Sequence, residues 1–393
     1  MSEKTDNKVP NVPNLRFSSS ILDWELKPIT TLIVECSETT SNFEKYPLYS
    51  FTIEDGVVPK SERYERSFLV KKDGDSFKVV KYNNFVMNPM NLRFGAISYS
   101  KVKNDVSVSG YYNIFNIDNA QCNDYWEALF RRTKTLKLYD SVATGSLLEK
   151  KRVHFSQFRS LKFYIPEYNE RIKISLFFSK INERIDTQSK IIEDIETLRK
   201  WIINQQFTRT ATNAIGEFIE QTSERNKTNC VDRVLSVSNK YGFINQSEQF
   251  EDREVASDNR TNYKIVRRND FAFNPARINV GSIAKLDTYD IGIVSPMYIC
   301  FKSNNKNLDV DYLSNFFSSN SFKNALNKRL EGSVRQCLQF DALCDIKLFV
   351  PSLDEQIFFV SKIKAITKKL AIEKDILSAY KKQKAYLLSN MFI

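Results

Sequence analysis

The feature that most constrains this chain is a tandem repeat. Residues 78–97 read KVVKYNNFVMNPMNLRFGAI, and residues 264–283 read KIVRRNDFAFNPARINVGSI. Phe85 matches Phe271 and Gly95 matches Gly281 in one constant register, and the same register holds upstream and downstream of these blocks. Chance does not hold one register over so many positions, so we expect two halves of the same fold.

Each half ends in a long segment that predicts a helix. A Gly-Ser pair, a short apolar stretch and a proline come first, and no Gly or Pro follows over about 167–207 or about 352–392. The register of the repeat is shifted by a single position here, where Phe207 matches Phe392, so one small insertion or deletion separates the two blocks. An uninterrupted segment of this length is typical of a single long helix.

Apolar residues recur along both helices with alternating gaps of four and three, which is the heptad pattern of a helix-pairing seam. The first seam contains Ile174, Phe178, Ile181, Ile185, Ile192, Ile195 and Ile202, and the second contains Phe359, Ile363, Ile366, Leu370, Leu377, Tyr380 and Leu387. Polar residues interrupt both seams at equivalent positions, which are Gln188 and Arg199 in the first and Glu373 and Lys384 in the second.

These matched interruptions favour pairing of the two helices over the alternative that each packs only on its own domain. In an antiparallel pair, one register places Arg199 beside Glu373 and Gln188 beside Lys384. The same register also places the apolar residues of the two seams opposite one another. A parallel pair would bring Arg199 next to Lys384, which is unfavourable. We therefore predict an antiparallel coiled coil on the order of 60 Å long, with a pseudo-two-fold axis.

Each globular half mixes short β-rich runs with polar turns and one helical run, which predicts an α/β (mixed α+β) fold. The β-rich runs are FKVVKY, VSVSGYYNIFNI, YKIVRR and IGIVSPMYICFK, and the helical runs are YWEALFRR and YLSNFFSS. The predicted divisions are a first domain at 1–165 with a flexible tail at 1–13, a helix at 166–208, a linker at 209–226, a second domain at 227–349 and a helix at 350–393.

The charge balance indicates a polyanionic partner. Lys and Arg total 58 against 47 Asp and Glu, a formal net charge of +11, although a generic basic surface would give the same surplus. The six cysteines include no CxxC pair and His154 is the only histidine, so no metal site is predicted. The absence of a long apolar run predicts a cytoplasmic protein that makes no membrane contact.

The sequence contains no motif that indicates catalysis. The ten glycines form neither GxGxxG nor GxxxxGK[ST], so no dinucleotide or nucleotide loop is indicated. A Ser-His-Asp or Cys-His arrangement would depend on His154 alone. We therefore expect no catalytic residues and no cofactor in this chain.

Basic and polar residues gather around the turns that the two halves share. Arg and Asn side chains read base edges, while Lys mainly contacts phosphate, so as a set these residues predict DNA contact. The alternative is solvated loop charge or purely structural turns. The candidates are Asn88, Asn91, Arg93, Lys101, Lys103, Lys150, Lys151 and Arg152 in the first half, and Arg267, Arg268, Asn274, Arg277, Asn279, Lys285, Ser333 and Arg335 in the second.

This layout resembles the specificity subunit of Type I restriction-modification systems over nearly the whole chain. The resemblance is carried by the strings NFVMNPMNLRFGAI, NDFAFNPARINVGSIA, IVSPMYICF, GSVR, PSLDEQ and KAYLLSNMF, and by VPNLRF with Trp24 near the start. The second half fits better, because the first has PEYNER in place of PSLDEQ and GSLLEK in place of GSVRQC.

The resemblance implies two target-recognition domains, each reading one half of a bipartite site on double-stranded DNA, with the helices fixing the spacer. Two modification (methyltransferase) subunits would dock on the helices and supply S-adenosylmethionine chemistry. Two motor-nuclease subunits would add restriction, using ATP and Mg²⁺. Two other functions stay open from the residues alone: a stand-alone regulatory or architectural DNA-binding protein, and a coiled-coil scaffold that does not read DNA.

Overall fold

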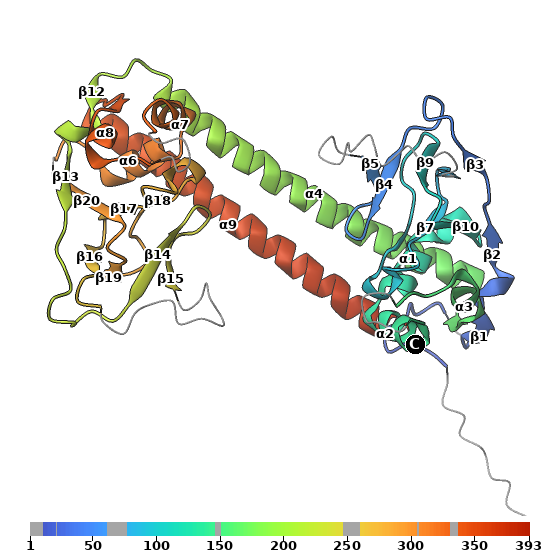
Figure 1. Cartoon of the computed structure of the whole chain (residues 1–393). Helices are drawn as coiled ribbons and strands as arrows, with labels where there is room; N and C mark the ends of the chain where they lie inside the picture. The colour runs from blue at the N-terminus through green and yellow to red at the C-terminus, as the bar shows by residue number, and fades with distance from the viewer. Residues whose placement is uncertain are drawn as a thin grey trace, which may run out of the picture. The chain divides into compact units, whose positions relative to one another are not determined.

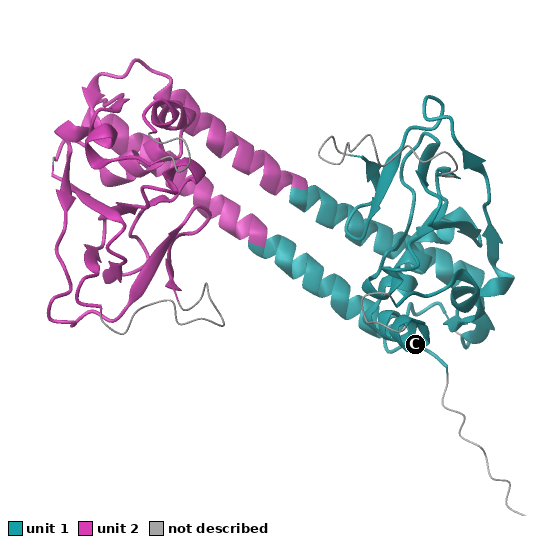
Figure 2. Cartoon of the chain, in the orientation of Figure 1, with its two compact units in different colours: residues 1–189, 375–393 teal, residues 190–374 magenta. Residues whose placement is uncertain are grey.

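The computed structural model divides into two compact units (Figure 2). Unit 1 comprises residues 1–189 and 375–393, and unit 2 comprises residues 190–374. The structure describes residues 11–20, 22–60, 77–145, 151–246, 260–304, 306–330 and 337–393, so most of the predicted tail at 1–13 lies outside it.

Unit 1 is built on an antiparallel sheet in the order β2-β10-β7-β8 (Figure 1). The strands are β2 (Ile33–Glu35), β10 (Asn113–Ile117), β7 (Phe85–Met87) and β8 (Ile97–Tyr99). The helices that share its core are α1 (Asn123–Arg131), α2 (Thr133–Val142) and α3 (Phe155–Ser160). The ring of Phe85 stacks on Phe115 at 5.4 Å and meets Phe130 edge-on at 5.9 Å, so strand and helix interlock through aromatic residues.

A second β layer covers a smaller aliphatic core in unit 1. It contains β3 (Thr39–Thr40), β6 (Phe77–Val80), β9 (Val106–Ser109), β4 (Tyr49–Thr52) and β5 (Gly56–Pro59). A separate ribbon pairs β1 (Glu25–Pro28) with β11 (Lys162–Ile165). The predicted run VSVSGYYNIFNI thus holds two strands of different sheets, because the Ser109–Tyr112 turn separates β9 from β10.

Unit 2 repeats this plan with the sheet β13-β20-β17-β18 and the second layer β15-β14-β19-β16. The first sheet contains β13 (Ile219–Thr222), β20 (Ile299–Ser303), β17 (Phe271–Phe273) and β18 (Ile283–Lys285). The second contains β15 (Gly242–Asn245), β14 (Val234–Ser238), β19 (Ile291–Val294) and β16 (Lys264–Arg267). The remaining elements are β12 (Asn213–Ala214), β21 (Lys347–Leu348), α6 (Val310–Phe317), α7 (Asn320–Asn327) and α8 (Phe340–Cys344).

The repeat seen in the sequence extends to backbone conformation. Gly95 and Gly281 both have φ of 91° and ψ of 21°, and each ends a single 3₁₀ turn, η4 (Leu92–Phe94) or η8 (Ile278–Val280). Asn83 and Asn269 both have φ of 71°. Left-handed backbone at matched positions means that the two halves share turn geometry as well as strand order.

The two long helices are α4 (Tyr168–Phe207) and α9 (Leu353–Asn390), close to the predicted bounds. In unit 1 the first turns of α4 and the residues after α9 enter the same core, where the rings of Phe178 and Phe392 lie 5.8 Å apart. In unit 2 the end of α4 and the start of α9 do the same, with Phe207 and Phe359 at 5.8 Å. Early residues of one helix therefore meet late residues of the other, and the predicted antiparallel pairing is confirmed within each unit.

We predict that Phe207→Ala lowers the free energy of unfolding by about 3–5 kcal/mol, because a cavity replaces a buried ring. That ring is 4% exposed and contacts the rings of Tyr312, Phe316 and Phe359. Urea denaturation followed by tryptophan fluorescence and circular dichroism measures the change. The control is Trp201→Ala on the same helix, where the side chain is 58% exposed and we expect a change within about 0.5 kcal/mol. Equal losses would contradict the docking of α4 into this core.

Candidate nucleic-acid interface

The turn that follows β17 carries three of the predicted DNA contacts of unit 2, Asn274, Arg277 and Asn279. The backbone N–H of Asn274 donates to the Ser282 carbonyl at 3.1 Å, and its side-chain oxygen accepts from the Ala276 N–H at 3.1 Å. Asn274 is only 8% exposed. Its side chain thus holds the turn, and this leaves Arg277 and Asn279 exposed on the outer face.

Unit 1 forms the same turn after β7. The Asn88 side-chain oxygen accepts from the Met90 N–H at 3.1 Å, and the Asn88 N–H donates to the Ala96 carbonyl at 3.0 Å. Asn91 is exposed on this turn, at the position that Arg277 occupies in unit 2. Asn88 and Asn274, both predicted DNA contacts, therefore have a structural role in their turns.

Several predicted cations are already engaged with carboxylates. Arg93 pairs with Asp140 at 2.6 Å. Arg267 pairs with Glu224 at 2.6 Å, and Arg268 pairs with Asp290 at 2.8 Å. These ion pairs are at least partly exposed, so each cation could exchange its carboxylate for a phosphate only by giving up an existing contact.

The prediction that Lys285 contacts DNA is corrected by the structure. Its side chain is 6% exposed and is ion-paired with Asp311 at the start of α6 and with Asp287. Asp311 also pairs with Lys364 of α9 at 2.5 Å. A buried ammonium needs a carboxylate partner, so Lys285 joins β18, α6 and α9 in the interior of unit 2.

In unit 1 the equivalent contact, between β8, α1 and α4, is made by neutral hydrogen-bond donors. The Tyr99 hydroxyl donates to Asp124 at 3.1 Å, and the Asn182 amide of α4 donates to the other Asp124 oxygen at 3.2 Å. Burial raises the pKa of Asp124, and the charge of Glu127 adds to this. In unit 2, burial would raise the pKa of Asp311, but hydrogen bonds from Lys285 and Lys364 outweigh it and lower the pKa.

We predict that Asp311→Asn costs about 1–3 kcal/mol of stability at neutral pH, because two ammonium groups lose a charged acceptor. The folded-state pKa of Asp311 lies below its unfolded value, so its contribution is present above the unfolded pKa and disappears as the pH falls through the folded pKa. Urea denaturation at pH 7 and below about pH 4 measures this. Asp290→Asn, at an exposed ion pair, is the control and should change stability by under about 1 kcal/mol at either pH. A cost for Asp311→Asn that does not depend on pH would contradict the role of charge.

The remaining predicted contacts of the first half are spread along its loops. Lys101 is exposed, its ammonium 5.4 Å from the Tyr99 ring centroid, and Lys103 is exposed on the same loop. Lys151 is half-buried and Arg152 is exposed, and the backbone of Arg152 pairs with Thr144. Lys150, Ser333 and Arg335 lie outside the described residues.

The polar residues predicted to pair across the helices have other neighbours. In unit 2, Glu373 is ion-paired with Lys369 of its own helix, while Glu196 pairs with Lys374 across the helices at 2.7 Å. Within the described part of the chain, the buried Nε of Arg199 has no hydrogen-bond partner. Burial lowers the pKa of this guanidinium, and the carboxylate charge that opposes the shift is that of Glu196. The predicted contact between Arg199 and Glu373 is therefore wrong, although the helix direction is right.

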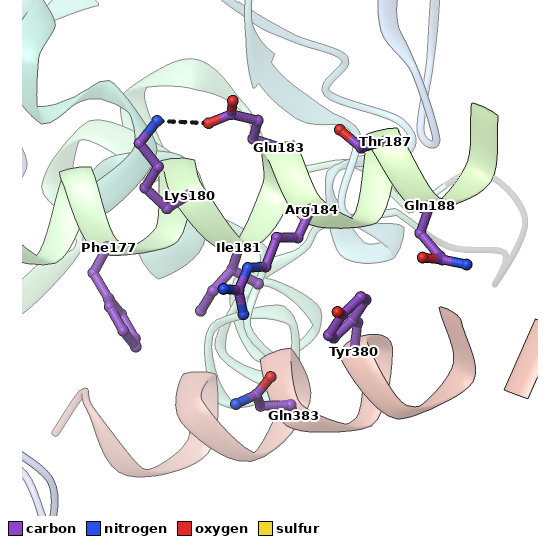
Figure 3. A pocket seen from close by; sticks show the side chains of 9 residues that line it. All are labelled: Phe177, Lys180, Ile181, Glu183, Arg184, Thr187, Gln188, Tyr380 and Gln383. Carbon is purple, nitrogen blue, oxygen red and sulfur yellow. Dashed lines mark hydrogen bonds and ion pairs between the residues drawn. The ribbon is translucent and has the colours of Figure 1, made fainter. Parts of the chain in front are cut away.

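Gln188 and Lys384 of unit 1 line different cavities. Gln188 borders a groove of about 630 Å³ between α4 and α9, together with Arg184 and Tyr380 (Figure 3). Lys384 faces a cavity of about 360 Å³ that is also lined by Asp186 and Glu127. Burial lowers the pKa of Lys384, and the charge of Glu127 opposes this. Lys384 thus shares its cavity with carboxylates of α1 and α4, whereas Gln188 lines a different groove, so polar residues at seam positions do not have to face each other.

Among the described residues, no group of His, Cys, Asp and Glu side chains has the arrangement of a metal site. No helix of the described chain is long and apolar enough to cross a membrane.

Comparisons with known proteins agree with the fold. No protein-family model matches the chain, and no curated protein matches its sequence. It is similar to the S subunit of a Type-I restriction-modification system from M. genitalium, with 14% sequence identity and a TM-score of 0.57, covering 97% of this chain and 99% of that one. A chain from a study of complex assembly and conformational transition in the type I R-M system matches with 13% identity and a TM-score of 0.55, covering 94% and 97%. The predicted fold, a duplicated mixed α/β unit with two long helices, is thus confirmed.

Proposed function

We propose that this chain is the DNA-recognition subunit of a Type I restriction-modification complex. The observation that carries the proposal is the likeness to an S subunit over 97% of the chain, which includes both units and both long helices. A protein with two copies of one reader suits a bipartite site, since the protein geometry then fixes the spacing of the half-sites. The long helices would set the unread spacer.

The two half-sites should differ in sequence, because the shared turns present different side chains. Unit 2 has Arg277 and Asn279 exposed, while unit 1 has Asn91 and an Arg93 that is ion-paired with Asp140. Base recognition depends on such donors and acceptors, whereas the backbone beneath them only positions the reader. Each unit would therefore contribute its own recognition sequence.

The long helices carry two equivalent exposed aromatic residues that suit the docking of modification subunits. Trp201 of α4 is 58% exposed and Tyr386 of α9 is 60% exposed, and the two occupy the same position in the repeat. Aromatic side chains of this kind often contribute most of the binding energy of a protein interface. Two equivalent positions fit two copies of one partner.

In this proposal the chemistry belongs to the partners. Two modification subunits would bind S-adenosylmethionine, and two motor-nuclease subunits would bind ATP and Mg²⁺. The recognition chain would position them on DNA and catalyse nothing itself.

The experiment that tests the proposal maps methylated bases in DNA from cells that express this chain together with a methyltransferase subunit encoded beside it. We expect a motif of two short blocks separated by a fixed unread spacer, which disappears when this chain is omitted. Methylation that does not depend on this chain would reject the proposal. A chain that binds DNA tightly and with the same preference in the absence of any partner would favour a stand-alone regulator instead.

We predict that Arg277→Glu weakens DNA binding by the assembled complex more than tenfold, because an exposed cation is lost and a repulsive charge is added. Fluorescence anisotropy over a salt series measures the affinity. Lys347→Glu makes the same change of charge at an exposed position on β21 and should alter affinity less than threefold. Equal losses in the two variants would mean that only net charge matters and would remove the η8 turn from the interface.

We also predict that Trp201→Glu and Tyr386→Glu each remove one modification subunit from the complex. A charge in place of an exposed aromatic anchor opposes docking, while the stability of the free chain should stay unchanged because both side chains are exposed. Native mass spectrometry counts the bound subunits, and the Trp201→Phe and Tyr386→Phe controls should retain them. A complete complex in both glutamate variants would place the docking surface elsewhere.

A further inference from the structure

Two turns of unit 2 that are far apart in the sequence lie against each other. One is the β14–β15 hairpin turn, residues 238–242, and the other is the η8 turn that carries Arg277. A methyl group placed on Gly281 would lie 3.5 Å from the Cβ of Asn239 in the hairpin turn. The buried hydroxyl of Ser282 donates to the Val237 carbonyl at 3.1 Å and ties the two segments together. The exposed residues of both turns thus share one rigid surface.

The tip of this hairpin presents a tyrosine with little contact to the protein. Tyr241 is 68% exposed, the highest exposure among the large hydrophobic side chains of the described chain. The ammonium of Lys240 lies 4.9 Å from the centroid of its ring. Packing in unit 2 therefore leaves most of this ring uncovered and available to a partner.

The backbone of the tip is pre-organised. The Ser238 hydroxyl accepts from the Lys240 N–H at 3.2 Å and from the Tyr241 N–H at 3.4 Å. Gly242 follows with φ of 67°, a left-handed conformation that closes the hairpin. An ordered tip gives up little conformational entropy when it binds, which suits a contact that must discriminate between similar ligands.

This surface carries two exposed cations, Lys240 and Arg277. Among the residues that the structure describes, neither Lys240 nor Arg277 forms an ion pair with a carboxylate, in contrast to Arg267 and Arg268 nearby in the sequence. Two available cations beside an exposed aromatic ring match double-stranded DNA, whose phosphates bind the cations and whose base edges can contact the ring.

Unit 1 carries the opposite charge at the equivalent tip. The residues at the matching positions of the repeat are Glu54 and Asp55, followed by Gly56 with φ of 69°. Both carboxylates line the cavity of about 360 Å³ that Lys384 also faces, and the Arg131 guanidinium donates to the Ile53 carbonyl at 2.5 Å. This hairpin turn therefore carries two carboxylates where unit 2 has Lys240 and Tyr241, and it is held against α1 of its own unit.

From this contrast we infer that Lys240 and Tyr241 are DNA contacts that help determine the half-site read by unit 2, acting beside Arg277, and that unit 1 has no counterpart at its equivalent tip. Lys240 would bind a backbone phosphate and Tyr241 would contact a base or its methyl group. The inference rests on the proposed function, since it concerns how that site reads double-stranded DNA.

The test uses the complete complex and the methylation motif established for the wild type. Tyr241→Ala should relax one position of a single half-site, with at least a fivefold loss of discrimination there, and leave the other half-site unchanged. Lys240→Ala should weaken binding to matched and mismatched duplexes alike and reduce the slope of log affinity against log salt by about 1. Thermal unfolding checks that both variants fold, and Tyr241→Phe, which keeps the ring, should retain most of the discrimination.

The matched controls are Glu54→Ala and Asp55→Ala at the equivalent tip of unit 1, where we expect less than a twofold change in affinity and no change in the motif. If the wild-type complex methylates a bipartite motif and Tyr241→Ala and Lys240→Ala leave motif and affinity unchanged, the inference fails while the proposed function stands. A loss of affinity in the unit 1 controls as large as that in the unit 2 variants would also overturn the asymmetry. If the wild-type chain directs no motif at all, the proposed function fails first.

Discussion

The structure depends on the burial of helix ends in the two globular cores. Phe178, near the start of α4, lies in the core of unit 1, and Phe207 ends the same helix in the core of unit 2. Along α9 the order is reversed, with Phe359 in the core of unit 2 and Phe392, just after the last residue of the helix, in the core of unit 1. Burying such a ring contributes roughly 2–3 kcal/mol relative to leaving it exposed. Neither globular core is complete without residues from both long helices.

The duplication separates what holds the fold from what distinguishes the halves. The stacked pair Phe85–Phe115 has its counterpart in Phe271–Phe301, and the parallel bridge between Leu48 and Ser107 returns as the pairing of Val234 with Ile293. These shared residues are buried or close the turns. The exposed residues on the same turns differ in charge and size, so one scaffold can present two unrelated surfaces.

Much of the architecture could be predicted from the sequence because it follows from periodicity. Apolar spacing located α4 and α9, and the register of the repeat matched Gly95 with Gly281, which end equivalent turns in the structure. The ion-pair partners of individual side chains were harder to predict. Lys285 looks like any loop lysine in the sequence, and only the fold shows that Asp311, 26 positions later, takes up its charge.

The surroundings of Lys384 and the exposure of Tyr241 were also not predicted, because both depend on the folded structure. The seam predicted that helix polar residues face one another, whereas Lys384 faces a cavity lined by Glu127 of the globular part, which no heptad pattern describes. The exposed Tyr241 was missed because a tyrosine in a turn gives no signal of its own. Comparing the SNKYG turn with its repeat partner TIEDG would have revealed the reversal of charge, because that comparison needs only the register of the repeat.

The division of the chain also sets an order of folding during synthesis. Unit 2 is a continuous stretch, residues 190–374, while unit 1 needs residues 375–393 in addition to the first 189. Met391 and Phe392 are 5% exposed in the core of unit 1, next to Trp24, so contacts that span most of the chain must close last. Contacts between such distant residues are slow to form, and apolar surface that waits for them stays open to aggregation. Unit 1 begins to leave the ribosome before unit 2 but, because it needs the last residues of the chain, it completes its folding after unit 2.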